Sequence, residues 1–179
     1  MQIRFGPCLL ELRQGDITDQ SVDAIVNAAN AELAGGSGVN GAVQRVGGPA
    51  IMADTSRLYP DGCPTGSAVV STAGQLPSRY IFHAVGPVWG GGRQGEEDLL
   101  RSAYTTCLEL AIQHECTSIA FPAISAGVYG YPADLAANHS LSAVRNFLVE
   151  RKAPQHVRFV LFSEGMYGAY ALALDEIIE

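Results

Sequence analysis

One stretch of the chain limits the possible fold more than any other. A short apolar run, residues 22–26, is followed at once by a segment rich in glycine and asparagine, residues 27–41. Four glycines fall within the seven positions 35–41, here called the glycine loop. Glycine lets backbone amides approach a ligand closely, as in loops that bind phosphate. The pattern predicts a buried strand leading into an anion-binding loop at the start of a helix.

The length and charge of the chain narrow the class of ligand. At 179 residues the chain is typical of one domain, so we expect residues 1–179 to form a single domain. The net charge is −7, and only 11 residues are lysine or arginine. This charge disfavours binding along a nucleic-acid backbone, which needs clustered basic residues. A small anionic ligand remains compatible with it, because backbone amides can bind one locally.

The cysteines and the apolar segments bear on location. The four cysteines, Cys8, Cys63, Cys107 and Cys116, show neither a C-x-x-C pair nor the spacing of a disulfide framework. We therefore expect reduced, buried thiols. No stretch approaches the roughly 20 apolar residues that a membrane span needs, and no signal-peptide pattern is present. These features predict a soluble cytoplasmic protein that makes no use of a membrane.

Hydrophobic periodicity and turn residues predict an alternation of strands and helices. Strands are expected at residues 3–5, 9–12, 23–27, 67–72, 80–85, 118–122 and 157–162. Helices are expected at residues 38–46, 49–58, 96–115, 133–151 and 166–178, with a helical turn over 19–22 that Thr18 caps. The first two strands predict an antiparallel start. The later alternation favours an α/β fold, a mixed or mostly parallel sheet covered by helices on both faces.

Two loops are candidates for binding phosphate. Residues 36–41 match the dinucleotide pattern G-x-G-x-x-G. In a Rossmann unit the glycines follow the strand almost immediately, whereas nine residues, 27–35, intervene here, so we reject a nicotinamide-binding assignment. The second loop, residues 125–130, also follows a strand and predicts the other side of a diphosphate site. The alternatives are a flexible surface loop for the first and an ordinary connection for the second.

Several polar residues have two interpretations. Asn27 and Asn30 lie where a strand is expected to become a loop, so they either project into a shared pocket or bond local backbone. Asp16 either starts a helix or accepts a hydrogen bond from the amino group of a base, and Asp23 is expected at the surface. His83 is expected to bond locally within a strand. The histidines show no metal-ligand spacing, so no metal site is predicted, and no catalytic triad stands out.

Six segments taken together resemble the macrodomain family. The similarity is greater to its MacroD-type branch, which includes bacterial O-acetyl-ADP-ribose deacetylases. The segments follow the family in order along roughly the whole chain: residues 15–18, 22–30, 35–41, 63–66, 83–87 and 121–132. An ordered set of motifs is more specific than one glycine pattern. The resemblance implies a three-layer α/β/α sandwich with a central mixed β-sheet, one macrodomain over residues 1–179.

The resemblance also implies a binding site for ADP-ribose. Asp16 would accept a hydrogen bond from the adenine amino group, Ile17 would pack beside the base, and Phe162 would stack on it. Asn27 and Asn30 would border the distal ribose. Backbone amides of two loops would hold the diphosphate: Gly35, Gly36, Ser37, Gly38 and Val39 in the first, and Ser125, Ala126, Gly127, Val128 and Tyr129 in the second. Tyr129 would also pack against the distal ribose.

The family's reaction is hydrolysis of an ester at the distal ribose. The implied ligands and substrates are ADP-ribose, O-acetyl-ADP-ribose and proteins that carry mono-ADP-ribose, with no cofactor or metal, and we expect a monomer. The implied catalytic residues are Asn27, Asn30, Asn40 and Tyr129. In the MacroD-type pattern an aspartate stands where this chain has Asn40, and a histidine usually stands where it has Gln44. Asparagine cannot take a proton, so turnover is expected to fall by about 10²–10⁴.

The same difference favours binding. A carboxylate beside the diphosphate would repel it by about 1 kcal/mol at 4 Å in water and about 4 kcal/mol at an effective dielectric of 20. We therefore expect this chain to bind ADP-ribose better than it hydrolyses esters. Two alternatives remain. One is a module that reads ADP-ribose without turnover, which Asn40 and Gln44 favour. The other is a site for a different nucleotide or RNA, which the net charge of −7 disfavours.

Overall fold

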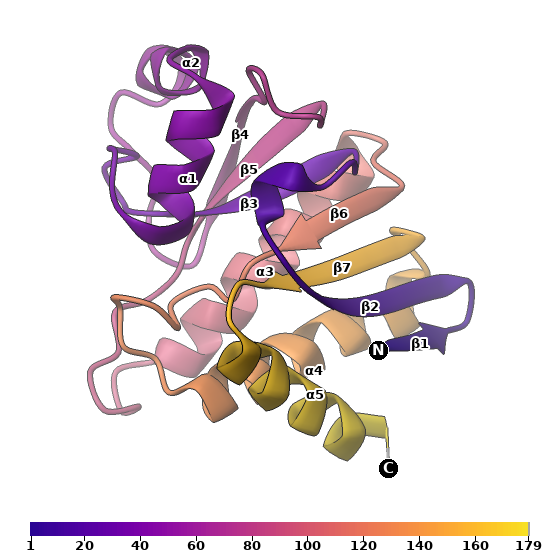
Figure 1. The fold of residues 1–179 in the computed structure, drawn as a ribbon. Helices are drawn as coiled ribbons and strands as arrows, with labels where there is room; N and C mark the ends of the chain where they lie inside the picture. The colour runs from indigo at the N-terminus through magenta and orange to yellow at the C-terminus, as the bar shows by residue number, and fades with distance from the viewer. Residues whose placement is uncertain (179) are drawn as a thin grey trace.

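A seven-stranded sheet lies between two layers of helices in the computed structural model, which describes residues 1–178 (Figure 1). The strands are β1 (Gln2–Phe5), β2 (Cys8–Gln14), β3 (Ala24–Ala29), β4 (Ala68–Thr72), β5 (Tyr80–Val85), β6 (Ser118–Phe121) and β7 (His156–Leu161). The helices are α1 (Gly38–Gly47), α2 (Ala50–Leu58), α3 (Glu96–Gln113), α4 (Ala133–Arg151) and α5 (Glu164–Ile178), with a 3-10 turn, η1 (Ile17–Asp19). The expected α/β/α sandwich is confirmed.

The sheet is mixed, with a parallel centre. Its strand order is β1-β2-β7-β6-β3-β5-β4. The five inner strands run parallel, whereas β1 pairs antiparallel with β2 and β4 pairs antiparallel with β5. Parallel strands bring their carboxyl ends to one edge of a sheet, where ligands bind in α/β proteins. Figure 1 shows the segments that follow β3, β5 and β6 on the same side of the sheet.

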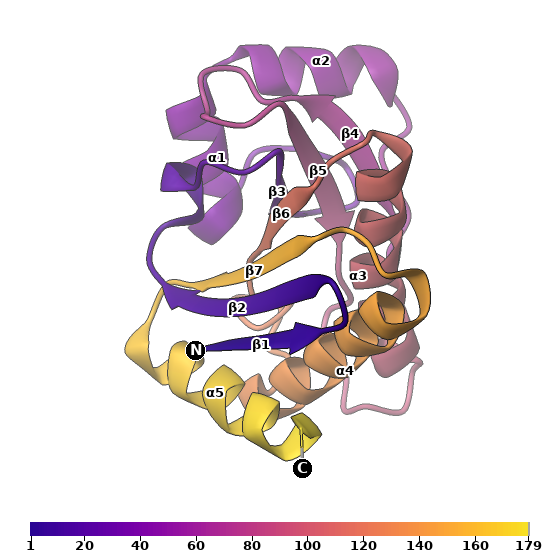
Figure 2. The same cartoon turned by 90° about the vertical axis from the view of Figure 1, so that its right-hand side faces the viewer.

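Alternate side chains of the strands face the two helical layers. Val26 and Phe82 belong to the larger core cluster, which α3, α4 and α5 cover. Ile25 and Ile81, their neighbours along the strands, belong to a second cluster with residues of α1 and α2. Figure 2 shows α1 and α2 beside the half of the sheet that contains β3, β5 and β4. This alternation, with both faces buried, is what parallel strands covered by helices require.

Two elements agree with the predicted bounds, and others differ at their ends. β5 and α4 occupy the predicted residues 80–85 and 133–151. β3 continues two residues beyond the predicted end because its pairing with β5 continues, as Ala28 opposite Ala84 and Ala29 opposite Val85. Asn27 therefore lies inside the strand and not at its junction with the loop. β7 ends at Leu161, so Phe162 lies just beyond the strand on which it was predicted.

The predicted helical turn at 19–22 is wrong in its position and in its cap. The turn forms at Ile17–Asp19, and its cap is Asp16, whose carboxylate accepts a hydrogen bond from the backbone N–H of Thr18 at 2.9 Å. Aspartate is a strong N-cap because its oxygen satisfies an N–H that has no partner within the turn. The cap interpretation of Asp16 is thus correct, and the carboxylate's other oxygen is left for a second role.

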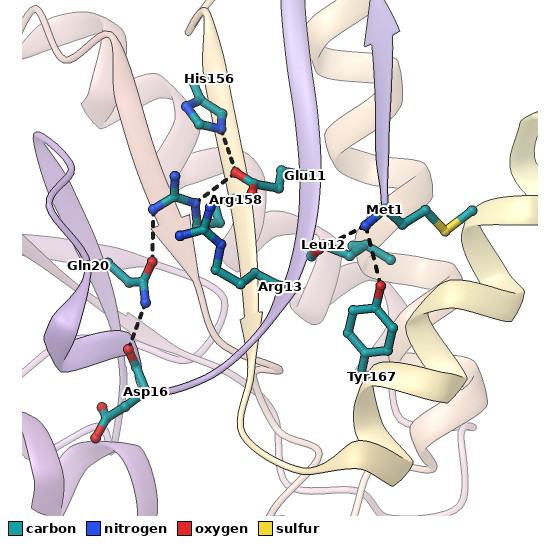
Figure 3. A network of polar contacts seen from close by, with 9 residues as sticks. All are labelled: Met1, Glu11, Leu12, Arg13, Asp16, Gln20, His156, Arg158 and Tyr167. Carbon is teal, nitrogen blue, oxygen red and sulfur yellow. Dashed lines mark hydrogen bonds and ion pairs between the residues drawn. The ribbon is translucent and has the colours of Figure 1, made fainter.

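A polar network covers part of the sheet over β2 and β7 (Figure 3). The Glu11 carboxylate, 5% exposed, accepts hydrogen bonds from Arg13, His156 and Arg158. Burial acts to raise the pKa of Glu11, but these hydrogen bonds and the charge of Arg158 outweigh it and lower the pKa to about 2. The carboxylate is therefore charged at neutral pH and joins the two strands.

Candidate functional site

A cavity of about 320 Å³ lies at the carboxyl edge of the sheet. Its walls come from the end of β3, the first turn of α1, and the loops that follow β5 and β6. Ten of the predicted site residues line it: Asn30, Gly36, Ser37, Gly38, Val39, Asn40, Ser125, Gly127, Val128 and Tyr129. The structure therefore brings the two predicted phosphate loops together around one space.

The glycine loop is shaped by close backbone approaches at the start of α1. Gly38 has a φ of 58°, in the left-handed region that favours glycine. A side chain at position 41 would place its Cβ 2.7 Å from the backbone oxygen of Gly36. Ser37 precedes α1 but makes no capping hydrogen bond with its side chain. The first N–H groups of α1 are consequently left for an external acceptor, as at helix N-termini that bind anions.

The second loop is held in place by hydrogen bonds at both of its ends. The hydroxyl of Tyr104, fully buried, donates to the Pro122 carbonyl at 2.9 Å and accepts from the N–H of Ile124 at 3.0 Å. On the other side, the N–H of Tyr131 donates to the Ser125 carbonyl at 3.0 Å. Between these anchors Val128 is 88% exposed. The loop is fixed at its base and open at its tip.

Ser125 occupies an unusual position in this loop. Its backbone has a φ of 67°, and its side chain is 6% exposed at the cavity wall. Within residues 1–178 no atom is placed to bond its hydroxyl oxygen. Gly86 lies against it, since a Cβ at position 86 would come within 2.2 Å of the Ser125 Oγ. A buried hydroxyl without a partner is costly, so this group is suited to a ligand or an ordered water.

Trp89, in the loop after β5, joins that loop to the second loop. Its backbone N–H donates to the Tyr129 carbonyl at 2.8 Å. Its ring lies 4.7 Å, between centroids, from the ring of Tyr131. The side wall of the cavity is thereby built from two connections that are far apart in the sequence.

Asn30 and Asn40 both bond the same backbone carbonyl. Asn30 closes a ring with Ala34, accepting from its N–H at 2.9 Å and donating to its carbonyl at 3.2 Å. The side-chain nitrogen of Asn40 donates to the same carbonyl at 3.0 Å. These bonds fix the segment between β3 and the glycine loop. They place both carboxamides at the cavity wall.

Asn27 lies elsewhere than predicted. It is fully buried and lies outside the cavity lining, beneath Asn40. Its side-chain nitrogen is 3.0 Å from Asn40 Oδ1 and 3.1 Å from His83 Nδ1. The prediction that Asn27 borders the ribose is therefore corrected to a role behind Asn40. The cause is the extension of β3 to Ala29, which keeps Asn27 on a covered face of the sheet.

His83 does not bond locally, contrary to expectation. It lies on β5 opposite Asn27 on β3, and its Nε2 is 2.7 Å from Ser71 Oγ on β4. Burial lowers the pKa of His83 to about 4, with a small opposing effect of Asp54, so the ring is neutral at neutral pH. The periodicity of the two strands offered a signal: residues 27 and 83 each lie two positions after a core isoleucine, Ile25 and Ile81.

The predicted adenine-binding residues lie outside this cavity. Asp16 Oδ1 accepts from the backbone N–H and the hydroxyl of Thr18, at 2.9 and 2.7 Å. Gln20 donates to the Asp16 carbonyl at 2.9 Å and accepts from Arg158 at 2.8 Å, which connects Asp16 to the Glu11 network (Figure 3). Ile17 is buried and Phe162 is 80% exposed. An exposed aromatic ring of this kind is available for stacking, and its prediction as an adenine contact stands untested.

Three further residues also lie away from the cavity wall. Gly35 and Ala126 flank lining residues of the two loops. Gln44 lies one turn after Asn40 on α1 and faces a separate open hollow between α1 and α2. The difference from the MacroD-type pattern at Gln44 therefore falls outside the cavity, whereas the difference at Asn40 falls on its wall.

The lining residues define what the cavity can do chemically. Its polar groups are carboxamides, hydroxyls and backbone amides, and among the described residues its wall holds no carboxylate or imidazole. Such a wall can bind an anion and orient a ribose, but it offers no side chain with a pKa suited to removing a proton from water.

The described part of the chain contains neither a cluster of metal ligands nor a membrane-spanning helix. No group of three or more histidine, cysteine, aspartate or glutamate residues within 1–178 is arranged to hold a metal ion. Over the same residues, no helix is long and apolar enough to cross a membrane.

Comparisons with known proteins place the chain in a family. The sequence profile of the Macro domain family matches residues 26–140. An O-acetyl-ADP-ribose deacetylase of Salmonella gallinarum is 48% identical over 170 residues, which are 93% of this chain and 94% of that protein. The structure of an Oceanobacillus iheyensis macrodomain with ADP has a TM-score of 0.94 at 39% identity, covering 99% of this chain and 96% of that one.

A more distant structure agrees. A Trypanosoma brucei macrodomain in complex with ADP-ribose has a TM-score of 0.86 at 38% identity, covering 92% of this chain and 68% of that one. Together with the α/β/α sandwich and the two loops around the cavity, these similarities establish that the chain belongs to the Macro domain family.

Proposed function

We propose that this protein binds ADP-ribose in the cavity between the glycine loop and the second loop. The observation that carries the proposal is the start of α1, where Ser37 leaves the first N–H groups uncapped and aimed at a cavity that the second loop closes. A diphosphate would accept from these amides. The similarity to macrodomains solved with ADP and with ADP-ribose supports the choice of ligand.

The remaining parts of ADP-ribose match the surroundings of the cavity. The distal ribose would lie against Asn30, Asn40 and Tyr129, which all line the cavity. The adenine would extend past η1 toward Asp16 and the exposed ring of Phe162. The base amino group would donate to the Asp16 oxygen that Thr18 does not occupy, and Ile17 would pack beside the ring.

We further propose that the protein hydrolyses esters at the distal ribose slowly. Its substrates would be O-acetyl-ADP-ribose and proteins carrying mono-ADP-ribose on acidic side chains, and the name of the Salmonella relative supports the first of these. Because no basic side chain lines the wall among the described residues, the substrate's own phosphate would have to take the proton from water. The reaction as proposed needs only water and no cofactor, and Asn40 limits its rate.

A non-catalytic reader of ADP-ribose is the second candidate. The absence of a carboxylate or imidazole on the described wall of the cavity favours it, since binding would then be retained without hydrolysis. Asn40 contributes a neutral group where a carboxylate would repel the diphosphate. In either case we propose a monomer in a reducing compartment such as the cytoplasm, in keeping with four free, buried cysteines.

Two experiments test these proposals. Calorimetric titration with ADP-ribose should show saturable binding, and no heat at high micromolar protein would refute the ligand. For catalysis, O-acetyl-ADP-ribose and a protein ADP-ribosylated on glutamate are incubated with the protein and with Asn40→Asp. Slow release that accelerates in the aspartate variant supports the enzyme. Intact substrate with both proteins supports the reader, and equal nonzero rates would show that position 40 does not limit the chemistry.

A further inference from the structure

A row of buried side chains lies directly beneath the cavity and ends at Asn40. We call Ser71, His83, Asn27 and Asn40 the His83 network. The first three come from the adjacent strands β4, β5 and β3, and the fourth comes from α1. All four side chains are nearly excluded from solvent, with exposures of 3%, 1%, 0% and 5%. Successive polar atoms along the row are 2.7, 3.1 and 3.0 Å apart.

The donors and acceptors of the network follow from the hydrogen bond that the Ser71 hydroxyl donates. The hydroxyl of Ser71 donates its single hydrogen to the Thr72 carbonyl at 2.9 Å, so its oxygen must accept from His83 Nε2–H. A neutral histidine that donates from Nε2 accepts at Nδ1, and Asn27 Nδ2 donates to it. The other hydrogen of Asn27 Nδ2 goes to Asn40 Oδ1.

The orientation of Asn27 is consistent with this direction. Both of its neighbours, His83 Nδ1 and Asn40 Oδ1, are acceptors, so only the amide nitrogen can face them. This orientation has an energetic cost, because the amide oxygen, Asn27 Oδ1, is buried without a partner among residues 1–178. A rotated Asn27 would satisfy neither neighbour, because its oxygen would then face two lone pairs.

The network determines what Asn40 can offer to a ligand. Its oxygen faces inward to Asn27, and one hydrogen of its nitrogen faces the Ala34 carbonyl at 3.0 Å. The second N–H hydrogen of Asn40 has no partner within residues 1–178, on a side chain that lines the cavity. Asn40 can therefore only donate to the ligand. An ionised aspartate in the same place could only accept. Asn40 therefore presents a donor to the ligand where an aspartate would present an acceptor.

We propose that His83 is a positioning residue for the distal-ribose end of the site, acting through Asn27 to hold Asn40 as a hydrogen-bond donor. The inference rests on the proposed binding of ADP-ribose and extends it to the recognition of an acceptor oxygen, on the distal ribose or on its ester. The role belongs to Nδ1 of His83, because that atom alone bonds Asn27. The other ring nitrogen, bonded to Ser71, serves to fix the tautomer.

Two substitutions of His83 distinguish the role of Nδ1 from that of Nε2. In His83→Asn the side-chain oxygen is attached to Cγ as Nδ1 is, so an acceptor for Asn27 is kept. In His83→Gln the side-chain nitrogen corresponds to Nε2, so the bond to Ser71 is kept and the acceptor for Asn27 is lost. Both variants lose the imidazole ring from a buried site and are expected to be destabilised to a similar degree.

The test is calorimetric titration of the unmodified protein and both variants with ADP-ribose and with ADP, which lacks the distal ribose. We expect His83→Gln to bind ADP-ribose about tenfold more weakly than the unmodified protein, the effect of one hydrogen bond, and His83→Asn to remain within about threefold. ADP should bind all three proteins alike. As a control for stability loss alone, Val144→Ala in α4, far from the cavity, should change neither affinity.

The outcomes distinguish this inference from the proposed function. If the unmodified protein binds ADP-ribose but the two variants lose affinity equally, or lose ADP as strongly as ADP-ribose, the role of His83 is structural and the inference fails alone. If the unmodified protein binds neither nucleotide, the proposed function fails and the inference with it.

A second measurement needs no variant. Nitrogen NMR of the unmodified protein at neutral pH should show His83 as the neutral tautomer protonated at Nε2. ADP-ribose should shift its Nδ1 resonance, and ADP should not. A ring protonated at Nδ1, or an Nδ1 resonance that responds to both nucleotides alike, would overturn the proposed direction of the network.

Discussion

The side-chain nitrogen of Asn40 donates to the Ala34 carbonyl at 3.0 Å, and this bond ties the first turn of α1 to the segment after β3. An aspartate at position 40 would place an oxygen against that carbonyl instead. The carboxamide therefore makes a bond at this position that an ionised carboxylate could not make.

We predict that Asn40→Asp trades stability and affinity for turnover. Loss of the bond to Ala34, and the repulsion that replaces it, should lower the free energy of unfolding by about 1–3 kcal/mol. The new charge should weaken ADP-ribose binding, while ester hydrolysis rises. Chemical denaturation, calorimetry and product release measure the three effects. Unchanged stability would show that Ala34 can turn away without cost.

Substitution of Gly41 should damage the anion site. In Gly41→Ala the added Cβ would lie 2.7 Å from the backbone oxygen of Gly36, so the glycine loop must move away from α1. We expect ADP-ribose affinity to fall at least tenfold. Gly168→Ala in α5 is the matched control, since its Cβ meets nothing within 4 Å and alanine favours a helix by about 1 kcal/mol. It should stabilise the protein and leave binding unchanged.

Ser125→Ala should have opposite effects on the stability of the free protein and on its affinity for ligand. The hydroxyl is buried without a partner among the described residues, so its removal should raise the free energy of unfolding by about 1 kcal/mol in the absence of ligand. If the hydroxyl contacts ADP-ribose, affinity should fall at the same time. Thermal unfolding with and without ADP-ribose measures both. A loss of stability in the free protein would mean that an ordered water already satisfies the group.

Stability should depend on pH through His83. Its pKa is about 4 in the folded protein and 6.5 when unperturbed, so the unfolded chain binds the proton more readily. Neutral His83 contributes its full stabilisation of the folded protein above pH 6.5. This contribution is lost as the pH falls toward 4, which lowers the free energy of unfolding by about 3 kcal/mol. Denaturation of the unmodified protein and His83→Asn between pH 7 and 4 isolates this effect, because Glu11, with a pKa of about 2, titrates mainly below this range in both. Parallel curves would contradict the prediction.

The sequence predicted the elements and the loops better than the contacts between strands. β5 and α4 have residues of clear propensity and periodicity, and their bounds agree with the prediction. The end of β3 was missed because Ala28 and Ala29 have little intrinsic preference for a strand. Their place is determined by pairing with Ala84 and Val85, which are 56 residues away.

The dependence on pairing between distant strands also made part of the site unpredictable from the sequence. Asn30 follows β3 directly and the two loops are rich in glycine, so local patterns could place them at the cavity, whereas Asn40 was identified through the resemblance to the MacroD-type pattern. The bond between Asn27 and His83 depends on which strands are neighbours and in what register, and neither is written in a local pattern. The interpretation of Asp16 as a cap is correct, because its position after a strand is itself a local signal, and its contact with a base stays a prediction.

The contact between Trp89 and the second loop makes the site observable without any label. The chain contains one tryptophan. Its backbone N–H donates to the Tyr129 carbonyl, and its ring packs against the ring of Tyr131. Occupation of the cavity is expected to alter the surroundings of that single indole through its contacts with the second loop. Its fluorescence is a built-in spectroscopic probe, by which ligand arrival at the second loop can be followed in real time.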